Sequence, residues 1–507
     1  MKKATLIIII LTIVSKLFGF SRDVVLSYFY GASNISDVYL IAYTIPGIIF
    51  SFIGTGIATS FIPLYSDIDR RNGTRRADLF TNNLIIVLLI LCGIFVFIGY
   101  YFSYPIVRAF AMGFDNTTLE LAVKFTRITV FGIFISVVIH IFTSYLNLKN
   151  NFHIPALVGI PNNIILIISI WLSVKLNIIL LPIGVVVSLL AQLFLVLIYV
   201  NKNGFKFNLQ LDIKDENLRK LVYLALPVVI GVSVNQINVL VDRTIASALV
   251  VGGISALNYA NRLNAFIQGI FVMSIATVMY PLISKMVVDN NIKGLKKALS
   301  DAITGINLIV LPVTIGSMTF TNQVISLLFG RGAFDSQAII LTSSALFFYS
   351  LGMVGFGLRE ILSRAFYSMQ DTKTPMINAA IGMVLNIILN IVLSRYLGIG
   401  GLALATSIAA IFTTALLFIS LRKKIGPFGM KQISISFLKI LIASLLMGVL
   451  AKLSFNYLTS TLSQNLSLLT AIGVGAVSYF GIIYFMKIED VDVMIGAIRR
   501  KLGRQDV

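Results

Sequence analysis

Seven basic side chains stand in or at the edge of long apolar runs of this 507-residue sequence. A charged side chain at the bilayer centre costs about 2.5–3.5 kcal/mol on insertion scales, so each should face a protein interior or a water-filled cavity. Acidic residues in the same runs are fewer, and the intramembrane balance is therefore positive. Such a site favours an anionic ligand, and the planar fork of arginine favours phosphate. The seven are Lys16, Arg22, Arg243, Arg262, Arg359, Arg364 and Lys439.

One group of these charges lies near the N-terminus. Lys16 and Asp23 are seven residues apart and share a face if this run is helical, and Arg22 lies beside Asp23. Asp37 stands at the edge of the next run. Acidic partners are too few for every basic residue, so we expect Arg22, Lys16 and Arg262 to bind an anion.

Three other runs carry polar faces at helical spacing. They comprise Asn235, Asn238 and Asp242 beside Arg243; Asn258 and Tyr259 with Arg262; and Glu360, Ser363, Arg364 and Tyr367 beside Arg359. A structural alternative exists for several charges, namely neutralisation within their own helix. These pairs would be Glu360 with Arg364, Asp242 with Arg243, and Asp23 with Arg22 or Lys16; Lys439 could instead extend to the membrane interface.

The elements that hold these residues are predicted to be membrane-spanning helices. Hydrophobic residues make up 58% of the chain and charged residues 12%, whereas soluble proteins carry about 25% charged residues. A span needs roughly 20 apolar residues. Fourteen runs meet this length, near 4–30, 38–65, 80–104, 121–148, 154–175, 177–200, 219–250, 254–286, 296–320, 337–368, 374–396, 399–421, 432–453 and 466–487.

The distribution of lysine and arginine predicts the orientation. With fourteen spans, 26 basic residues fall on the side that holds both termini and seven on the opposite side. By the positive-inside rule both termini are expected to be cytoplasmic. The net charge of +20 is therefore read as a membrane signal rather than a nucleic-acid one.

An internal repeat predicts the domain organisation. The segment IATSFIPLYS at 57–66 recurs as IATVMYPLIS at 275–284, and the motif at 111–115 is echoed at 330–335. An even number of spans per repeat gives both lobes the same orientation, so they should be related by a pseudo-two-fold axis along the membrane normal, with a substrate site between them. We expect an all-α integral membrane protein with a six-helix lobe over 1–218, a second over 219–430, and two further helices with a cytoplasmic tail over 431–507.

The sequence carries no recognisable signature of catalysis. The two histidines, His140 and His153, have no cysteine or carboxylate cluster near them in the sequence, and Cys92 stands alone in an apolar run. No phosphate-binding loop, GxSxG or HExxH motif occurs. We therefore expect a transporter without metal or cofactor rather than an enzyme.

Several motifs together resemble the MviN/MurJ family of lipid II flippases. They are SKLFGFSRDVV at 15–25, GISALNYANRL at 253–263, LLFGRGAFD at 327–335, SRAFYSMQDTKTP at 363–375 and GLALATS at 401–407. The resemblance implies a relative of MATE exporters with fourteen helices, a cationic central cavity, a groove at the last two helices for a polyprenyl tail, and dependence on membrane potential. It also implies that Arg22 and Arg262 bind diphosphate and that Asp37 matches an acidic position.

Two positions depart from that family. Lys16 stands where the family usually has arginine, which keeps the charge but loses the fork. After the proline of the second span the family shows paired arginines and then Glu-Gly, whereas this chain has Phe50, Ser51 and Thr55. Arg243 or Arg359 could supply the missing charge from other helices.

The cationic helices together with this resemblance imply a flippase for lipid II in the bacterial inner or plasma membrane, working by alternating access. Asn235, Asn238 and Asn258 are expected to contact sugar or peptide, and the expected partners are a lipid-linked glycan, membrane lipids and cell-wall synthesis proteins. Alternatives are a flippase for another polyprenyl-linked oligosaccharide, a MATE-like drug exporter, a membrane glycosyltransferase or a scaffold. A drug exporter should have an acidic cavity, and a glycosyltransferase should have a clustered acid–base or metal site.

Overall fold

The fold was analysed in a computed structural model that describes residues 2–208 and 211–486. These two ranges contain eighteen helices and no strand, which confirms the predicted all-α class. Long apolar sequences favour helices in a membrane because a helix satisfies its backbone hydrogen bonds internally.

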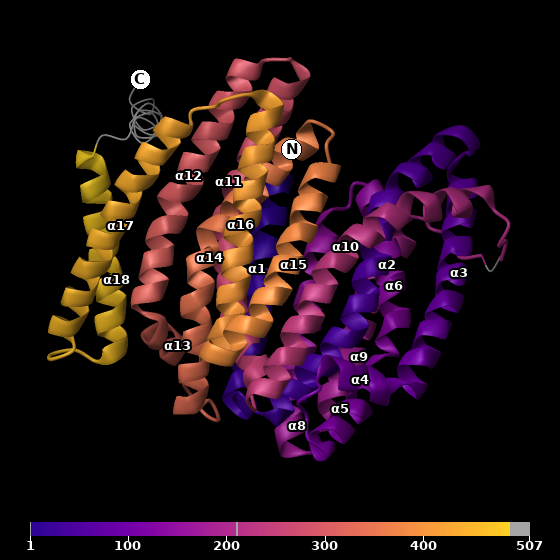
Figure 1. The fold of residues 1–507 in the computed structure, drawn as a ribbon. Helices are drawn as coiled ribbons and strands as arrows, with labels where there is room; N and C mark the ends of the chain where they lie inside the picture. The colour runs from indigo at the N-terminus through magenta and orange to yellow at the C-terminus, as the bar shows by residue number, and fades with distance from the viewer. Residues whose placement is uncertain (1, 209–210, 487–507) are drawn as a thin grey trace. The chain divides into compact units, whose positions relative to one another are not determined.

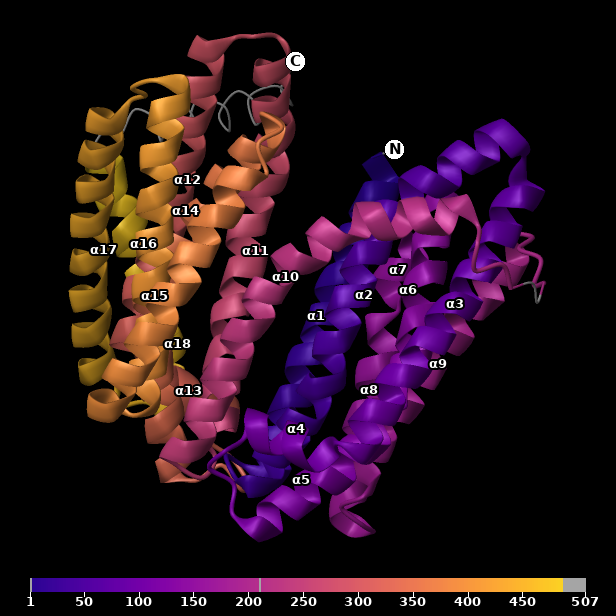
Figure 2. The same cartoon turned by 45° about the vertical axis from the view of Figure 1, so that its right-hand side comes forward.

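The chain forms two compact units (Figures 1 and 2). Unit 1 comprises Met1–Ala256 and Phe329–Ala338, and unit 2 comprises Leu257–Leu328 and the chain from Ile339 onward. The first eleven helices are α1 Lys2–Tyr30, α2 Asn34–Asn72, α3 Thr74–Tyr101, α4 Ser103–Phe110, α5 Asn116–Thr129, α6 Gly132–Leu148, α7 His153–Leu157, α8 Gly159–Lys175, α9 Leu180–Lys202, α10 Glu216–Leu249 and α11 Gly253–Val288. The remaining helices are α12 Ile292–Thr319, α13 Thr321–Phe329, α14 Ser336–Ser368, α15 Lys373–Leu397, α16 Ile399–Ile425, α17 Met430–Leu458 and α18 Gln464–Phe485.

The number of spans is close to the predicted fourteen. Within the described residues, twelve helices are long and apolar enough to cross a membrane, or thirteen if α5 and α6, bent by 42°, form one span. The 29-residue α1 is not in that set, although the sequence predicts it as the first span. The count of fourteen, the two-lobe symmetry and the lobe boundaries remain predictions.

The core of unit 1 forms around α2, which packs against α3, α5, α6 and α10. Phe61 of α2 stacks on Phe80 of α3 with ring centroids 6.3 Å apart. Tyr65 of α2 donates its hydroxyl hydrogen to Asp78 of α3 at 2.9 Å. Buried aromatic rings provide large apolar contact areas, and the buried hydroxyl keeps a polar partner. This rigid frame positions the N-terminal part of α2, where the site residues lie.

The two loops of the repeated motif, at 111–115 and 330–335, are exchanged: within unit 1 each of them packs against a helix of the other predicted repeat. In the first, the N–H of Gly113 donates to Ser247 Oγ at the end of α10 at 3.2 Å. In the second, the N–H of Ala333 donates to the carbonyl of Tyr28 at the end of α1 at 2.8 Å. Both approaches are close: a Cβ on Gly332 would lie 2.2 Å from that same carbonyl oxygen. Each loop thus contacts the first long helix of the other predicted repeat.

Unit 2 has a core formed by α11, α12, α14 and α16, to which α17 and α18 are added. Helices α17 and α18 run side by side in Figure 1, and α17 also packs on α12. The Tyr479 hydroxyl of α18 donates to the carbonyl of Leu308 in α12 at 2.6 Å. The predicted C-terminal pair is therefore a firm part of unit 2, whereas the tail from residue 487 lies outside the described residues.

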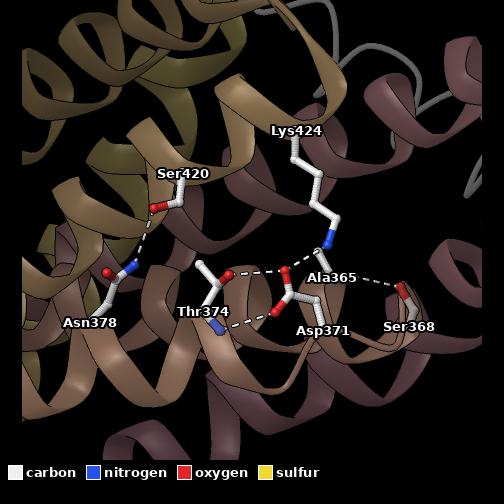
Figure 3. A network of polar contacts seen from close by, with 7 residues as sticks. All are labelled: Ala365, Ser368, Asp371, Thr374, Asn378, Ser420 and Lys424. Atoms are coloured by element: carbon white, nitrogen blue, oxygen red, sulfur yellow. Dashed lines mark hydrogen bonds and ion pairs between the residues drawn. The ribbon is translucent and has the colours of Figure 1, made fainter.

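A polar network ties the turn before α15 to α16 (Figure 3). Asp371 accepts from Lys424 Nζ at 2.6 Å and from the backbone N–H and the hydroxyl of Thr374 at 3.0 and 2.9 Å. These bonds, chiefly that from Lys424, lower the pKa of Asp371 to about 2. One turn farther along, Asn378 donates to Ser420 at 3.3 Å. The network stabilises the start of α15 because Asp371 satisfies a donor that has no partner inside the helix.

Candidate functional site

The basic residue Arg22 is buried in α1 and already has an anionic partner. Its Nε and Nη2 atoms donate to Asp23 Oδ1 at 3.0 and 2.6 Å, and 7% of Arg22 is exposed. The guanidinium also lies 5.9 Å from the ring centroid of Tyr43 in α2. Asp23 thus neutralises Arg22 within its own helix, as one alternative from the sequence predicts. An arginine has five N–H donors, so the pair can still receive a second anion.

Lys16 lies in the same helix as Arg22, one and a half turns closer to the N-terminus, and its side chain is exposed. Lys16 and Arg22 therefore differ as cations: the side chain of Lys16 is exposed, whereas Arg22 is buried and held by Asp23.

Asp37 acts as an N-terminal cap of α11. Its Oδ2 accepts from the N–H of Gly252 at 3.0 Å, and its Oδ1 accepts from the N–H and the hydroxyl of Ser255, both at 2.7 Å. The residue is 1% exposed. A carboxylate at a helix N-terminus satisfies orphan N–H groups and is favoured by the helix dipole. These contacts are those of a positioning residue, and a direct substrate contact by Asp37 stays a prediction.

The polar stripe of α10 is partly described. Asn238, Asp242 and Arg243 are half-buried, and the side chain of Asn235 lies outside the described set. The amide oxygen of Asn238 is buried and has no hydrogen-bond partner within the described residues. Arg243 acts electrostatically on the buried carboxylate of Asp37. Arg243 therefore attracts the carboxylate that caps α11.

In unit 2, Arg262 is exposed on α11 and Asn258 is half-buried one turn before it. Arg359 of α14 is half-buried, and its guanidinium lies 5.3 Å from the ring centroid of Phe356. Glu360 and Arg364, also in α14, form an ion pair with Oε1 and Nε 2.8 Å apart. Their geometry therefore matches the alternative drawn from the sequence, in which Glu360 and Arg364 neutralise each other.

Arg364 has further contacts across to α11. Its Nη2 lies 3.7 Å from the sulfur of Met273, and its guanidinium lies 5.7 Å from the ring centroid of Tyr280. With the ion pair to Glu360, these contacts fix the side chain between two helices. Arg364 thus contributes to helix packing as well as to charge.

The place of the missing arginines is filled by an aromatic contact. The ring of Phe50 in α2 lies 4.4 Å from the imidazole of His140 in α6, in an edge-on arrangement. Gly54, one turn later, has no room for a side chain, because a Cβ there would lie 2.8 Å from His140 Nε2. That nitrogen is buried without a hydrogen-bond partner in the described part of the chain. In the sequence, His140 was examined only as a possible metal ligand. No sequence pattern indicates its long-range contact with Phe50.

A small cavity of about 100 Å3 adjoins the same contact. Tyr43, Pro46 and Phe50 form one wall, and Asn162 and Ser188 contribute polar atoms to the other. The cavity lies inside unit 1. It is lined both by the ring of Tyr43, which faces Arg22, and by the ring of Phe50, which faces His140. Its volume suits a few water molecules rather than a lipid headgroup.

Comparisons with known proteins agree on one family. Residues 26–473 match the family model described as lipid II flippase MurJ. A relative from Vibrio cholerae, the probable lipid II flippase MurJ, is 30% identical over 514 residues, which cover 97% of each chain. A solved structure of lipid II flippase MurJ in an inward closed conformation has a TM-score of 0.84 at 30% identity and covers 96% of this chain and 100% of that one. An inward-facing MATE family transporter of the MOP superfamily has a TM-score of 0.68 at 17% identity over 81% of this chain and 94% of its own, a likeness of fold alone.

Proposed function

The chain belongs to the lipid II flippase MurJ family, and from that membership we propose that it moves lipid II across the membrane. In this proposal an undecaprenyl-diphosphate-linked peptidoglycan precursor passes from the cytoplasmic to the outer leaflet by alternating access. The protein is then a multi-pass transporter of the bacterial inner membrane, and the asymmetry of 26 to seven basic residues supports cytoplasmic termini. Cell-wall synthesis proteins are its proposed partners.

The observation that carries this proposal is the positive charge on apolar helices. Lys16 and Arg22 on α1 and Arg262 on α11 are the cations that we assign to the diphosphate. Arg22 brings a buried guanidinium that Asp23 already orients, and diphosphate oxygens accept charge-assisted hydrogen bonds from such a fork. Lys16 and Arg262 are exposed within their units and can follow a moving headgroup.

The neighbouring polar groups have supporting roles in the proposal. Amide side chains both donate and accept hydrogen bonds, which suits sugar hydroxyls and peptide groups; these are Asn235, Asn238 and Asn258. Other charges set the local field, and Asp37 fixes the start of α11. The auxiliary charges are Asp23, Asp242, Arg243, Arg359, Glu360 and Arg364.

A second candidate substrate follows from the contact between Phe50 and His140. Because the family arginines are absent there, the site carries less positive charge and more aromatic surface than the family pattern implies. Another polyprenyl-diphosphate-linked oligosaccharide, whose sugars stack on aromatic rings, is therefore the alternative cargo.

Native mass spectrometry of the detergent-purified chain tests both candidates. Lipid II, a polyprenyl-diphosphate oligosaccharide without peptide, and a neutral lipid are added in turn to wild type and to Arg22→Ala/Arg262→Ala. We expect lipid II adducts on wild type that fall at least about tenfold in the double variant, since each lost charged hydrogen bond is worth about 1.5–3 kcal/mol.

The matched control is Arg75→Ala/Arg76→Ala, which removes two arginines from the exposed start of α3. Its adducts should equal those of wild type. Lipid II adducts that survive in Arg22→Ala/Arg262→Ala would refute the diphosphate site, and adducts with the peptide-free lipid alone would favour the second candidate.

A further inference from the structure

A separate cavity of about 720 Å3 opens in unit 2 where α16 passes into α17. Its wall combines Arg422 in the last turn of α16 with the connecting loop and the first three turns of α17. Lys431 and Lys439 line it from α17, together with Gln432 and Ser436. This volume lies within the usual range of small-molecule sites, about 300–1,000 Å3.

The polar lining is positively charged. Lys431 and Lys439 are eight residues apart and therefore share one face of α17, while Arg422 approaches from α16. Among residues 2–208 and 211–486, no carboxylate lines the cavity and none forms an ion pair with Arg422 or Lys431.

The loop that shapes the cavity is firmly anchored. Phe428 is 2% exposed, and its ring stacks on Phe418 with centroids 6.3 Å apart. Gly426 and Gly429 on either side have φ angles of +79° and +39°, a region that favours glycine. The basic groups are thus held around the cavity by a turn with a defined backbone conformation.

We propose that this cavity, the basic pocket of Arg422, Lys431 and Lys439, binds a phosphate-bearing anion at the cytoplasmic surface. The ligand is the phosphodiester headgroup of an anionic phospholipid or free phosphate. Basic pockets between membrane helices on the cytoplasmic side bind anionic headgroups, and Ile435 and Met430 supply an apolar wall for a lipid's glycerol and upper acyl chain. None of the residues assigned to lipid II lines the basic pocket, so this site is independent of the transported substrate.

Titration of the detergent-purified full chain tests the basic pocket. Binding of phosphatidylglycerol, phosphatidylcholine and inorganic phosphate is measured by native mass spectrometry and calorimetry on wild type and on Arg422→Gln/Lys431→Gln. Each basic residue near a headgroup contributes about fivefold in affinity. The double variant should therefore bind phosphatidylglycerol about 25-fold more weakly, and wild type should prefer phosphatidylglycerol to phosphatidylcholine.

The control Lys373→Gln/Lys423→Gln removes the same charge from exposed residues of unit 2 that do not line the basic pocket. It should bind like wild type, and both double variants should keep their lipid II adducts, which verifies folding. Inorganic phosphate that binds wild type as tightly as phosphatidylglycerol identifies free phosphate as the ligand; phosphate at least tenfold weaker identifies the lipid.

Three outcomes would overturn the proposal. One is equal phosphatidylglycerol affinity in wild type and Arg422→Gln/Lys431→Gln, and another is an equal loss in the control. The third concerns the acidic sequence Glu489, Asp490 and Asp492, which follows the Met486 carbonyl that Lys439 contacts at 3.0 Å. If only a chain with these three residues neutralised to amides binds phosphatidylglycerol, the tail rather than a lipid is the occupant.

Discussion

Replacement of Asp37 by alanine should open the start of α11. Asp37 accepts three hydrogen bonds from Gly252 and Ser255 at 2.7–3.0 Å, and it is almost fully buried. At about 1.5 kcal/mol for each bond to a charged acceptor, the low end of the usual range, the loss for three bonds is about 4.5 kcal/mol. This corresponds to roughly a thousandfold shift in the local opening equilibrium.

Hydrogen exchange of the peptide that contains residues 250–258, measured by mass spectrometry in detergent, reports this opening directly. Asp37→Ala should accelerate exchange at Gly252 and Ser255 roughly a thousandfold, and Ser255→Ala, which removes the hydroxyl bond alone, roughly tenfold. Asp67→Ala, a substitution at a surface ion pair of the same helix, should leave that peptide unchanged.

Unaltered exchange in Asp37→Ala would refute the capping role. If Asp37→Ala then still lost lipid II binding, Asp37 would be a substrate contact, as its match to an acidic position of the family suggests. Accelerated exchange with retained binding would assign Asp37 to positioning alone.

Three further changes test the packing described above. Gly54→Ala should destabilise the protein by about 1–3 kcal/mol because its Cβ meets His140 Nε2, and a His140→Ala background should relieve most of that cost; thermal unfolding of the four proteins measures the coupling. The pKa of Asp371 is lowered to about 2 by its lysine partner, so its contribution to stability is present above about pH 4 and lost as pH falls toward 2. The stability difference between wild type and Asp371→Asn should therefore be constant from pH 5 to 8 and shrink below pH 4; a constant difference down to pH 2 would contradict the ion pair. Gly332→Ala should lower the melting temperature more than Gly204→Ala, because both glycines have positive φ but only Gly332 faces a backbone oxygen within 4 Å.

The helical architecture was largely predictable because length and apolarity alone decide which segments can span a bilayer. The runs near 374–396 and 399–421 correspond to α15 and α16 within a few residues at most. The short helices α4 and α13 were missed because they contain eight and nine residues, too few for a span. The 42° bend between α5 and α6 was missed because no proline marks the break.

The candidate site was predictable where its partners are local in sequence. The pairs of Arg22 with Asp23 and of Glu360 with Arg364 follow from spacing of one and four residues. The cap formed by Asp37 on Ser255 spans 218 residues, and no single-sequence pattern reports such a contact. The contact of Phe50 with His140 was hidden for the same reason.

The exchanged loops also constrain how this protein is made. The carbonyl of Tyr28, at the end of α1, enters the membrane about 300 residues before Ala333, which donates to it. At synthesis rates of about 5–20 residues per second, α1 waits roughly 15–60 s for that partner. During this interval the carbonyl of Tyr28 lacks that donor, although α1 can already pack on α8, where the hydroxyls of Tyr30 and Ser173 lie 2.7 Å apart. A nascent chain that stops before residue 329 therefore cannot complete unit 1. Membrane quality control would recognise such a chain as incompletely folded.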